Sequence, residues 1–159
     1  IQLSAELVVL GTGDKTYEKA LTRQMRTRSN GFSAIIGYND EKARYIYAGS
    51  DMFLMPSRFE PCGLGQLIAL KYGSIPIVRA TGGLMDSITD YRKDRSEGNG
   101  FVFEEFEGED MIATIGDAIE VYGHKDEWEA LVKKAALENF SWRKSSRQYM
   151  DYYNRLLSV

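Results

Sequence analysis

Residues 57–67, with the sequence SRFEPCGLGQL, place an arginine, a carboxylate and the chain's single cysteine beside two glycines. The stretch follows the apolar run 52–56 and runs into the start of a predicted helix over 63–73. It could therefore hold a catalytic cysteine, a phosphate-binding loop or an ordinary strand-to-helix turn. The backbone N–H groups of residues 62–65 would point out of the helix N-terminus, and such helix ends bind phosphate. Gly63 and Gly65 would let an oxygen approach the backbone closely.

A carboxylate at Glu60 would repel a phosphate bound at the same place. We therefore expect Glu60 to serve another part of the ligand, such as sugar hydroxyls or a developing cation. An anion site and a carboxylate a few residues apart suit a sugar phosphate or a nucleotide sugar.

A nucleophilic role for Cys62 would require a nearby base, and His124, the only histidine, falls in a polar junction between predicted helices. A small side chain beside the ligand is the favoured interpretation of Cys62. One histidine and one cysteine also give little material for a metal site, so no metal is expected.

Apolar runs bounded by glycine or proline alternate with helical patterns along the first half of the chain. Strands are predicted at 7–10, 32–38, 52–56, 74–80 and 101–103, and helices at 15–27, 39–50 and 63–73. An edge strand is expected within 81–91 and an exposed loop at 92–100. The alternation predicts an α/β fold with a Rossmann-like, doubly wound parallel sheet covered on both faces. We expect one domain over 1–159, in which 109–159 form a helical tail.

Ligands of such sheets bind beyond the carboxyl ends of the strands. Tyr38 could stack on a nucleobase or be half-buried packing, and Arg58 and Arg79 could meet anionic oxygens. A tight turn is the simplest alternative for each glycine. The other candidates at predicted strand ends are Gly11, Gly13, Gly37, Thr81, Gly82 and Gly83.

The composition excludes several classes of function. The 159 residues are 43% hydrophobic and carry a net charge of -3, so a nucleic-acid-binding surface is not indicated. No apolar run approaches the ~20 residues needed to span a membrane. A single cysteine cannot form an internal disulfide, which favours a reducing compartment. The first residues lack an initiator methionine and signal-peptide features, so we expect a chain cut from a larger protein.

The segment SRFEPCGLGQLIALKYGSIPIVRATGGLMDSITD closely resembles the C-terminal, nucleotide-binding lobe of bacterial glycogen synthases and plant starch synthases. VVLGTGD, IIGYNDEKARYIYAGSD and NGFVF occur around it in the family's order. The resemblance implies a GT-B glycosyltransferase of two Rossmann-like lobes that uses ADP-glucose and needs no cofactor. It would add glucose in α-1,4 linkage to the non-reducing end of a glucan with retention of configuration. It would work in the bacterial cytoplasm or the plant plastid.

The resemblance also implies residue roles. Glu60 would bind the donor glucose and help to stabilise positive charge at the reacting carbon. Backbone N–H groups of Cys62 and Gly63 would face glucose hydroxyls, and those of Leu64 and Gly65 would hold the distal phosphate. Tyr38 would stack on adenine beside Gly37, and Gly11 and Gly13 would line the nucleotide. The family commonly has threonine at the position of Gly65, and many GT-B enzymes have a glutamate at that of Ile68.

The family's phosphate-binding arginine and lysine would precede Ile1, and its acceptor-binding lobe would lie outside this chain. We therefore expect the chain alone to bind ADP weakly and to lack synthase activity. Two other functions stay open: a lobe of another retaining GT-B transferase that uses a UDP-sugar, and a non-catalytic glucan-binding module. Whether the product is glycogen or starch is not decided by the sequence.

Overall fold

The computed structural model describes residues 4–27 and 31–157. The chain divides into two compact units, Ile1–Ser50 and Asp51–Val159. Every strand pair in the described residues is parallel, and helices follow the strands, as the sequence pattern predicts.

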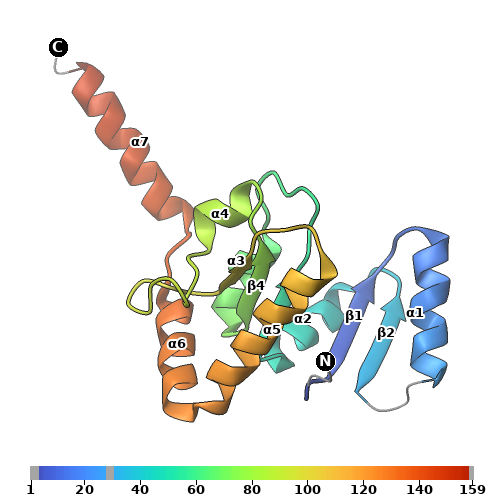
Figure 1. Ribbon diagram of the computed structural model, residues 1–159. Helices are drawn as coiled ribbons and strands as arrows, with labels where there is room; N and C mark the ends of the chain where they lie inside the picture. The colour runs from blue at the N-terminus through green and yellow to red at the C-terminus, as the bar shows by residue number, and fades with distance from the viewer. Residues whose placement is uncertain (1–3, 28–30, 158–159) are drawn as a thin grey trace. The chain divides into compact units, whose positions relative to one another are not determined.

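In the first unit, β1 (Leu7–Gly11) pairs with β2 (Phe32–Ile36), and α1 (Lys15–Thr27) packs on β2 (Figure 1). Gly11 stands opposite Ile36, so the carboxyl ends of both strands meet at one edge. The helix α2 (Asp40–Gly49) begins after Asn39, whose side chain accepts a hydrogen bond of 2.8 Å from the Lys42 N–H. This cap fixes where the chain turns after β2.

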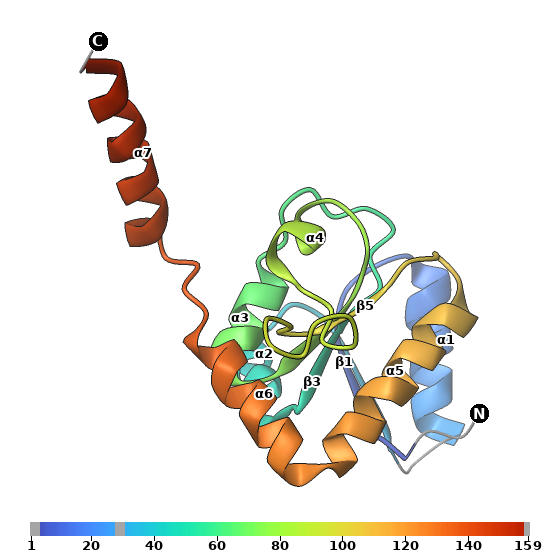
Figure 2. The same ribbon diagram turned by 60° about the vertical axis from the view of Figure 1, so that its left-hand side comes forward.

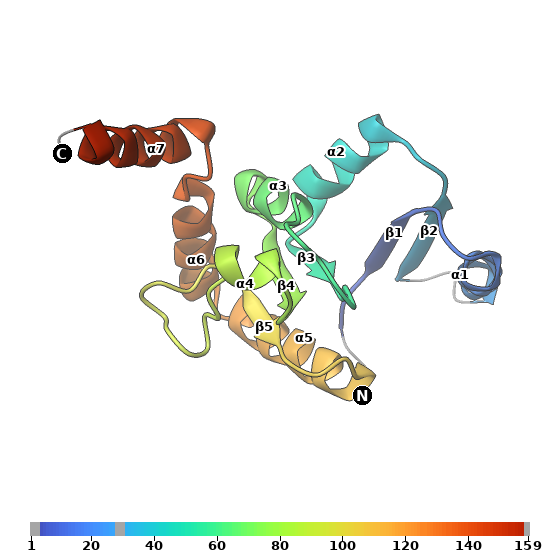
Figure 3. The ribbon, with the colours of Figure 1, turned by 90° about the horizontal axis from the view of Figure 1, so that it is seen from above.

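In the second unit, β4 (Ile75–Arg79) lies between β3 (Met52–Met55) and β5 (Phe101–Phe103). Helix α3 (Gly65–Tyr72) covers one face of this sheet and α5 (Gly108–Gly123) covers the other (Figure 3). Helix α6 (Lys125–Leu137) packs against both α3 and α5 (Figure 2). The core lies where these layers meet, around Phe101, Ile77 and Leu131.

The expected edge strand within 81–91 is wrong. The structure has a short helix, α4 (Gly83–Ser87), and a single parallel bridge between Asp90 and Gly100. Pairing stops there because the chain turns, and the N–H groups of Lys93 and Asp94 both donate to the Asp90 carbonyl at 3.1 Å. The expected exposed loop is correct for 92–97, but Gly98, Asn99 and Gly100 are buried.

The last helix, α7 (Trp142–Leu157), has no buried residue. Trp142, Leu156 and Leu157 are among the most exposed of the large apolar side chains in the described residues. No helix in the described residues has the length and apolarity needed to cross a membrane.

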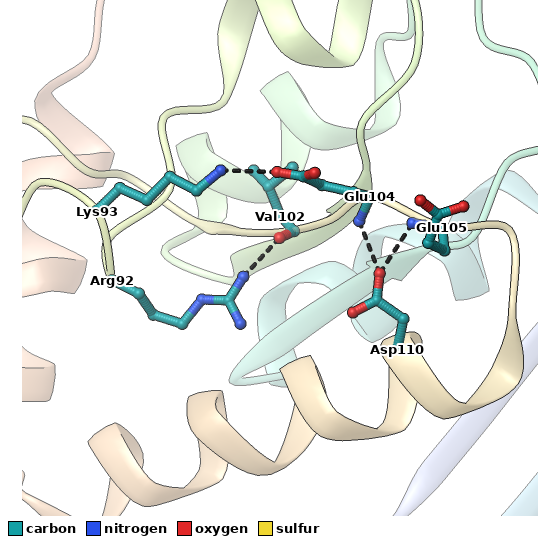
Figure 4. Close-up of a pocket in the computed structure, with 6 residues that line it drawn as sticks. All are labelled: Arg92, Lys93, Val102, Glu104, Glu105 and Asp110. Atoms are coloured by element: carbon teal, nitrogen blue, oxygen red, sulfur yellow. Dashed lines mark hydrogen bonds and ion pairs between the residues drawn. The ribbon is translucent and has the colours of Figure 1, made fainter.

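Arg92 joins the turn after α4 to β5 and α5 (Figure 4). Its guanidinium donates to the buried Asp90 carboxylate at 2.7 Å and to the Val102 carbonyl at 2.6 Å. It also donates to Asp117 at 2.7 Å and to Thr114 at 3.3 Å. The hydrogen bonds from Arg92 to Asp90, and then to Asp117, raise the pKa of the guanidinium. The hollow drawn in Figure 4 is thus lined by polar groups that are paired with other groups of the protein.

Replacing Arg92→Met should destabilise the second unit by about 2–4 kcal/mol, because the buried Asp90 carboxylate loses its charged partner. Urea unfolding followed by circular dichroism measures the change. Lys93→Met is the control, since Lys93 and Glu104 are each 67% exposed and such a solvent-screened pair contributes little to stability. Equal effects of the two substitutions would contradict the role given to Arg92.

Candidate functional site

The loop after β3 and the loop after β4 meet at the carboxyl edge of the second unit's sheet. The parallel pairing of the two strands brings their ends together. The Gly83 N–H donates to the Glu60 carbonyl at 3.0 Å, so the predicted residues of both loops are in direct contact.

The glycine pair that opens α4 allows the two backbones to touch. A Cβ atom on Gly82 would lie 2.1 Å from the Glu60 carbonyl oxygen. A Cβ atom on Gly83 would lie 2.4 Å from the Cys62 carbonyl oxygen and 2.6 Å from its Cα. Gly82 also has a φ of +46°, a backbone conformation that residues with a side chain rarely adopt. Glycine at both positions is therefore required by close backbone packing.

Arg79, at the end of β4, holds the start of the loop. Its Nε donates to the Ser57 carbonyl at 2.8 Å, and its Nη2 donates to the Arg58 carbonyl. Its guanidinium also lies 5.5 Å from the centre of the Phe106 ring. The sequence suggested that Arg79 could meet anionic ligand oxygens. In the structure its guanidinium donates to carbonyl groups of the protein instead. Arg58 has an exposed side chain.

The N-terminus of α3 has no side-chain cap. Its N-cap residue is Leu64, whose apolar side chain can accept no hydrogen bond from the first turn. Within residues 4–27 and 31–157, nothing accepts a hydrogen bond from the backbone N–H of Cys62, Gly63 or Leu64. Gly65 is the first helical residue, so its N–H has no partner within the helix either. The helix end thus presents the row of backbone donors that the sequence predicts.

Glu60 lies immediately before these donors and is partly buried. No described residue gives its carboxylate a hydrogen bond or an ion pair. The carboxylate is therefore available to a ligand hydroxyl or a developing positive charge. Phe59 and Leu64, which are 71% and 70% exposed, flank this stretch.

Gly65 fits closely against β3. A Cβ atom there would lie 3.1 Å from the Phe53 ring and 3.4 Å from the sulfur of Met55. A larger side chain at this position would have to displace the Phe53 ring. Ile68, one turn further along α3, is 41% exposed.

The structure gives the nucleophile interpretation of Cys62 no support. Cys62 is exposed and free, but His124 lies at the junction of α5 and α6. Helix α5 starts after the carboxyl end of β5 and runs back along the sheet for 16 residues, or about 24 Å. The junction of α5 and α6, which contains His124, therefore lies toward the opposite edge, and Figure 2 shows this junction at the end of α5 far from α4. In the part of the chain that is described, no group of three or more acidic, histidine or cysteine side chains could hold a metal ion.

Gln66, which contacts the loop, and Ser87, which contacts Gln66, are not among the predicted site residues. The buried Gln66 side chain donates to the carbonyls of Cys62 and Gly63, at 3.3 and 3.1 Å. Its Nε2 also lies 3.1 Å from Ser87 Oγ. The only local signal was a glutamine in the first turn of a helix without a cap.

The predicted residues of the first unit gather at its own carboxyl edge. The Gly37 N–H donates to the Gly11 carbonyl at 3.0 Å, which places the ends of β1 and β2 side by side. Tyr38 is 91% exposed, so its ring is free to stack. The Gly13 N–H is already engaged, because it donates to Glu18 at 3.1 Å.

Gly83→Ala should lower stability by about 1–3 kcal/mol, since the new methyl group would press on the Cys62 backbone. Gly116→Ala is the matched control, because a Cβ there meets no atom within 4 Å and lies inside α5. It should raise stability by about 0.5–1 kcal/mol. Thermal unfolding of both variants measures these changes, and a Gly83→Ala variant as stable as wild type would refute the contact.

Comparison with known proteins identifies the family. Residues 2–136 match the family described as "Glycosyl transferases group 1". A glycogen synthase of Bacillus cereus (strain ATCC 10987 / NRS 248) is 50% identical over 152 residues, covering 96% of this chain and 32% of that protein. A glycogen synthase of Bacillus cytotoxicus is 47% identical over 159 residues, covering 100% of this chain and 33% of that protein. The chain thus spans about a third of the length of these relatives.

Solved structures agree with this result. The catalytic domain of starch synthase IV from Arabidopsis thaliana, bound to ADP and acarbose, matches 97% of this chain and 33% of its own. The TM-score is 0.85 and the identity 34%. Sucrose-phosphate synthase from Thermosynechococcus elongatus shares only the fold, with a TM-score of 0.66, 16% identity, and 96% of this chain and 39% of its own covered. These matches confirm the predicted fold class and resemblance, and the chain belongs to the group 1 glycosyl transferases.

Proposed function

We propose that the chain is the donor-nucleotide-binding lobe of a retaining glucosyltransferase. The enzyme would transfer glucose from ADP-glucose to the non-reducing end of an α-1,4-glucan. Relatives named glycogen synthase at about half identity, and the likeness to a starch synthase bound to ADP and acarbose, support this proposal. The donor carries its own leaving group, so the proposal includes no cofactor.

The observation that carries the proposal is the Glu60 carboxylate, which no described residue pairs with, beside the uncapped N-terminus of α3. In the transfer, the bond between the sugar's anomeric carbon and the diphosphate oxygen breaks, and its electrons leave with ADP. A bond to the acceptor 4-hydroxyl forms, and the hydroxyl proton is released. Positive charge develops on the sugar meanwhile, and a carboxylate near it lowers the barrier. Glu60 would supply that negative charge and bind a donor hydroxyl.

The negative charge on the leaving diphosphate must be stabilised by positive charge or by hydrogen-bond donors. The N–H groups of Leu64 and Gly65, together with the α3 dipole, would bind its distal phosphate. Those of Cys62 and Gly63 would face the glucose hydroxyls. The remaining cations and the acceptor site would come from the part of the enzyme outside this chain. We propose that the exposed apolar side chains of α7 pack on that part.

Tyr38 would stack on the nucleobase, with Gly37 leaving room beside it. Aromatic stacking accepts any base, so this contact alone is equally compatible with a UDP-sugar. The ADP in the starch synthase structure favours adenine.

The isolated chain should bind ADP weakly, bind UDP more weakly still, and transfer no measurable glucose. The physical reason is that half of the cleft and its cations would be absent. Isothermal titration with both nucleotides, and incorporation of labelled ADP-glucose into glycogen, test this expectation. Turnover by the chain near that of a full-length relative would refute it, and tighter binding of UDP would favour the UDP-sugar alternative.

In a full-length protein that contains this chain, Glu60→Gln should lower kcat by about 100-fold or more. Its affinity for ADP should change by less than about threefold, because ADP lacks the sugar that Glu60 contacts. Glu97→Gln is the control, since Glu97 is an exposed carboxylate in the 92–97 loop. Wild-type turnover by the Glu60→Gln enzyme would show that Glu60 takes no part in the reaction. Glucan co-sedimentation without any nucleotide binding would favour the glucan-binding module instead.

A further inference from the structure

We infer that Gln66 is a positioning residue, which sets the direction of the backbone N–H groups that hold the donor. This inference rests on the proposed function of the α3 N-terminus. It concerns a residue that contacts the loop from behind and would not touch the ligand.

The Gln66 side chain is completely buried, although it belongs to the exposed end of α3. Its Nε2 donates to the carbonyl oxygens of Cys62 and Gly63, at 3.3 and 3.1 Å. The two bonds reach back four and three residues, so the side chain folds under the loop that precedes the helix. The amide thus fixes two consecutive peptide groups.

The position of these carbonyls determines where the following N–H groups point. None of the peptide bonds in the described residues is cis. In a planar trans peptide, the carbonyl of one residue and the N–H of the next point in opposite directions. Since the carbonyls of Cys62 and Gly63 point to Gln66, the N–H groups of Gly63 and Leu64 point away from it. These are two of the free donors proposed for glucose hydroxyls and phosphate.

Gly63 makes this arrangement possible. Its φ is +71°, and a Cβ atom there would lie 2.5 Å from the Gln66 side-chain oxygen. Only glycine lets the loop take this conformation directly over the amide. The glutamine and the glycine therefore require each other.

A second network holds Gln66 in place. Ser87 Oγ lies 3.1 Å from Gln66 Nε2 and donates to the Gly83 carbonyl at 3.0 Å. The buried Asn99 donates to the Ser87 carbonyl at 3.0 Å and accepts from the Thr89 N–H at 2.9 Å. Gln66 is thereby tied to α4 and to the segment before β5.

The side-chain oxygen of Gln66 has no hydrogen-bond partner among the described residues. Turning the amide over would place this oxygen against two carbonyl oxygens, which is less favourable because acceptors would then face acceptors. An unpaired buried oxygen is costly for stability, so packing alone does not explain a glutamine here. An apolar residue of similar volume would fill the same space without that cost, but it could not orient the loop.

The test uses a full-length protein that contains this chain. Gln66→Met keeps the volume and removes the donors, so it should preserve cooperative unfolding. It should weaken ADP binding and raise the KM for ADP-glucose by about tenfold or more, while the KM for glucan stays unchanged. Gln66→Glu, which replaces the donor by an acceptor facing two carbonyls, should bind ADP no better than Gln66→Met.

Thr114→Val is the matched control, because Thr114 is another fully buried polar residue, whose side chain contacts Arg92. It should lower stability and leave ADP binding unchanged. If Gln66→Met fails to fold, Ser87→Ala tests the inference in its place. This substitution removes the contact between Ser87 Oγ and the Gln66 amide, and it should weaken ADP binding about two- to fivefold.

Wild-type ADP affinity in a folded Gln66→Met or, failing that, in Ser87→Ala would overturn the inference. A loss of affinity that only parallels the loss of stability, as measured with Thr114→Val, would overturn it too. A wild-type protein that binds no ADP would instead refute the proposed function itself, so the two failures are distinguishable.

Discussion

The site depends on one contact, the approach of the Gly82–Gly83 backbone to the backbone of residues 60–62. Two main chains can come this close only where one of them carries no side chain on the side that faces the other. The contact fixes the loop after β3 against the start of α4. Because the Glu60 carbonyl takes part in this contact, it also restricts the direction in which the Glu60 side chain points. Parallel strands bring the two loops to the same edge, but the glycines decide their distance.

Other interactions around the loop act on carbonyl groups. Arg79 binds the carbonyls of Ser57 and Arg58, Gln66 binds those of Cys62 and Gly63, and Gly83 binds that of Glu60. Several acceptors of the loop are thus engaged by the protein, whereas no described residue accepts a hydrogen bond from its N–H donors from Cys62 to Leu64. This division makes the loop a surface of positive polarity, which suits an anionic donor. The Glu60 carboxylate supplies the negative charge beside it.

Much of this could be predicted from the sequence. The alternation of apolar runs with helical segments indicated parallel strands, and Gly63 and Gly65 before an apolar helix indicated a free helix N-terminus. The contacts of Arg79 with the loop and of Gln66 with Ser87 span 21 to 22 residues, so no local pattern reveals them. The failed edge strand has a similar cause, because a turn stabilised by the Asp90 carbonyl ends the pairing after one residue. The sequence predicts Gly82 and Gly83 as residues that line the ligand. The structure adds a role in backbone packing, which the pattern of apolar residues does not predict.

Leu64 as the N-cap of α3 has a consequence for protein engineering. A routine stabilisation protocol would replace it by serine or aspartate, since such a cap strengthens a helix by about 1 kcal/mol. The new side chain would satisfy the same donors that the loop keeps open, and an aspartate would add a charge that repels phosphate. Thermal stability and ligand affinity would then move in opposite directions at a single exposed position, so a screen for heat resistance alone would select against the activity.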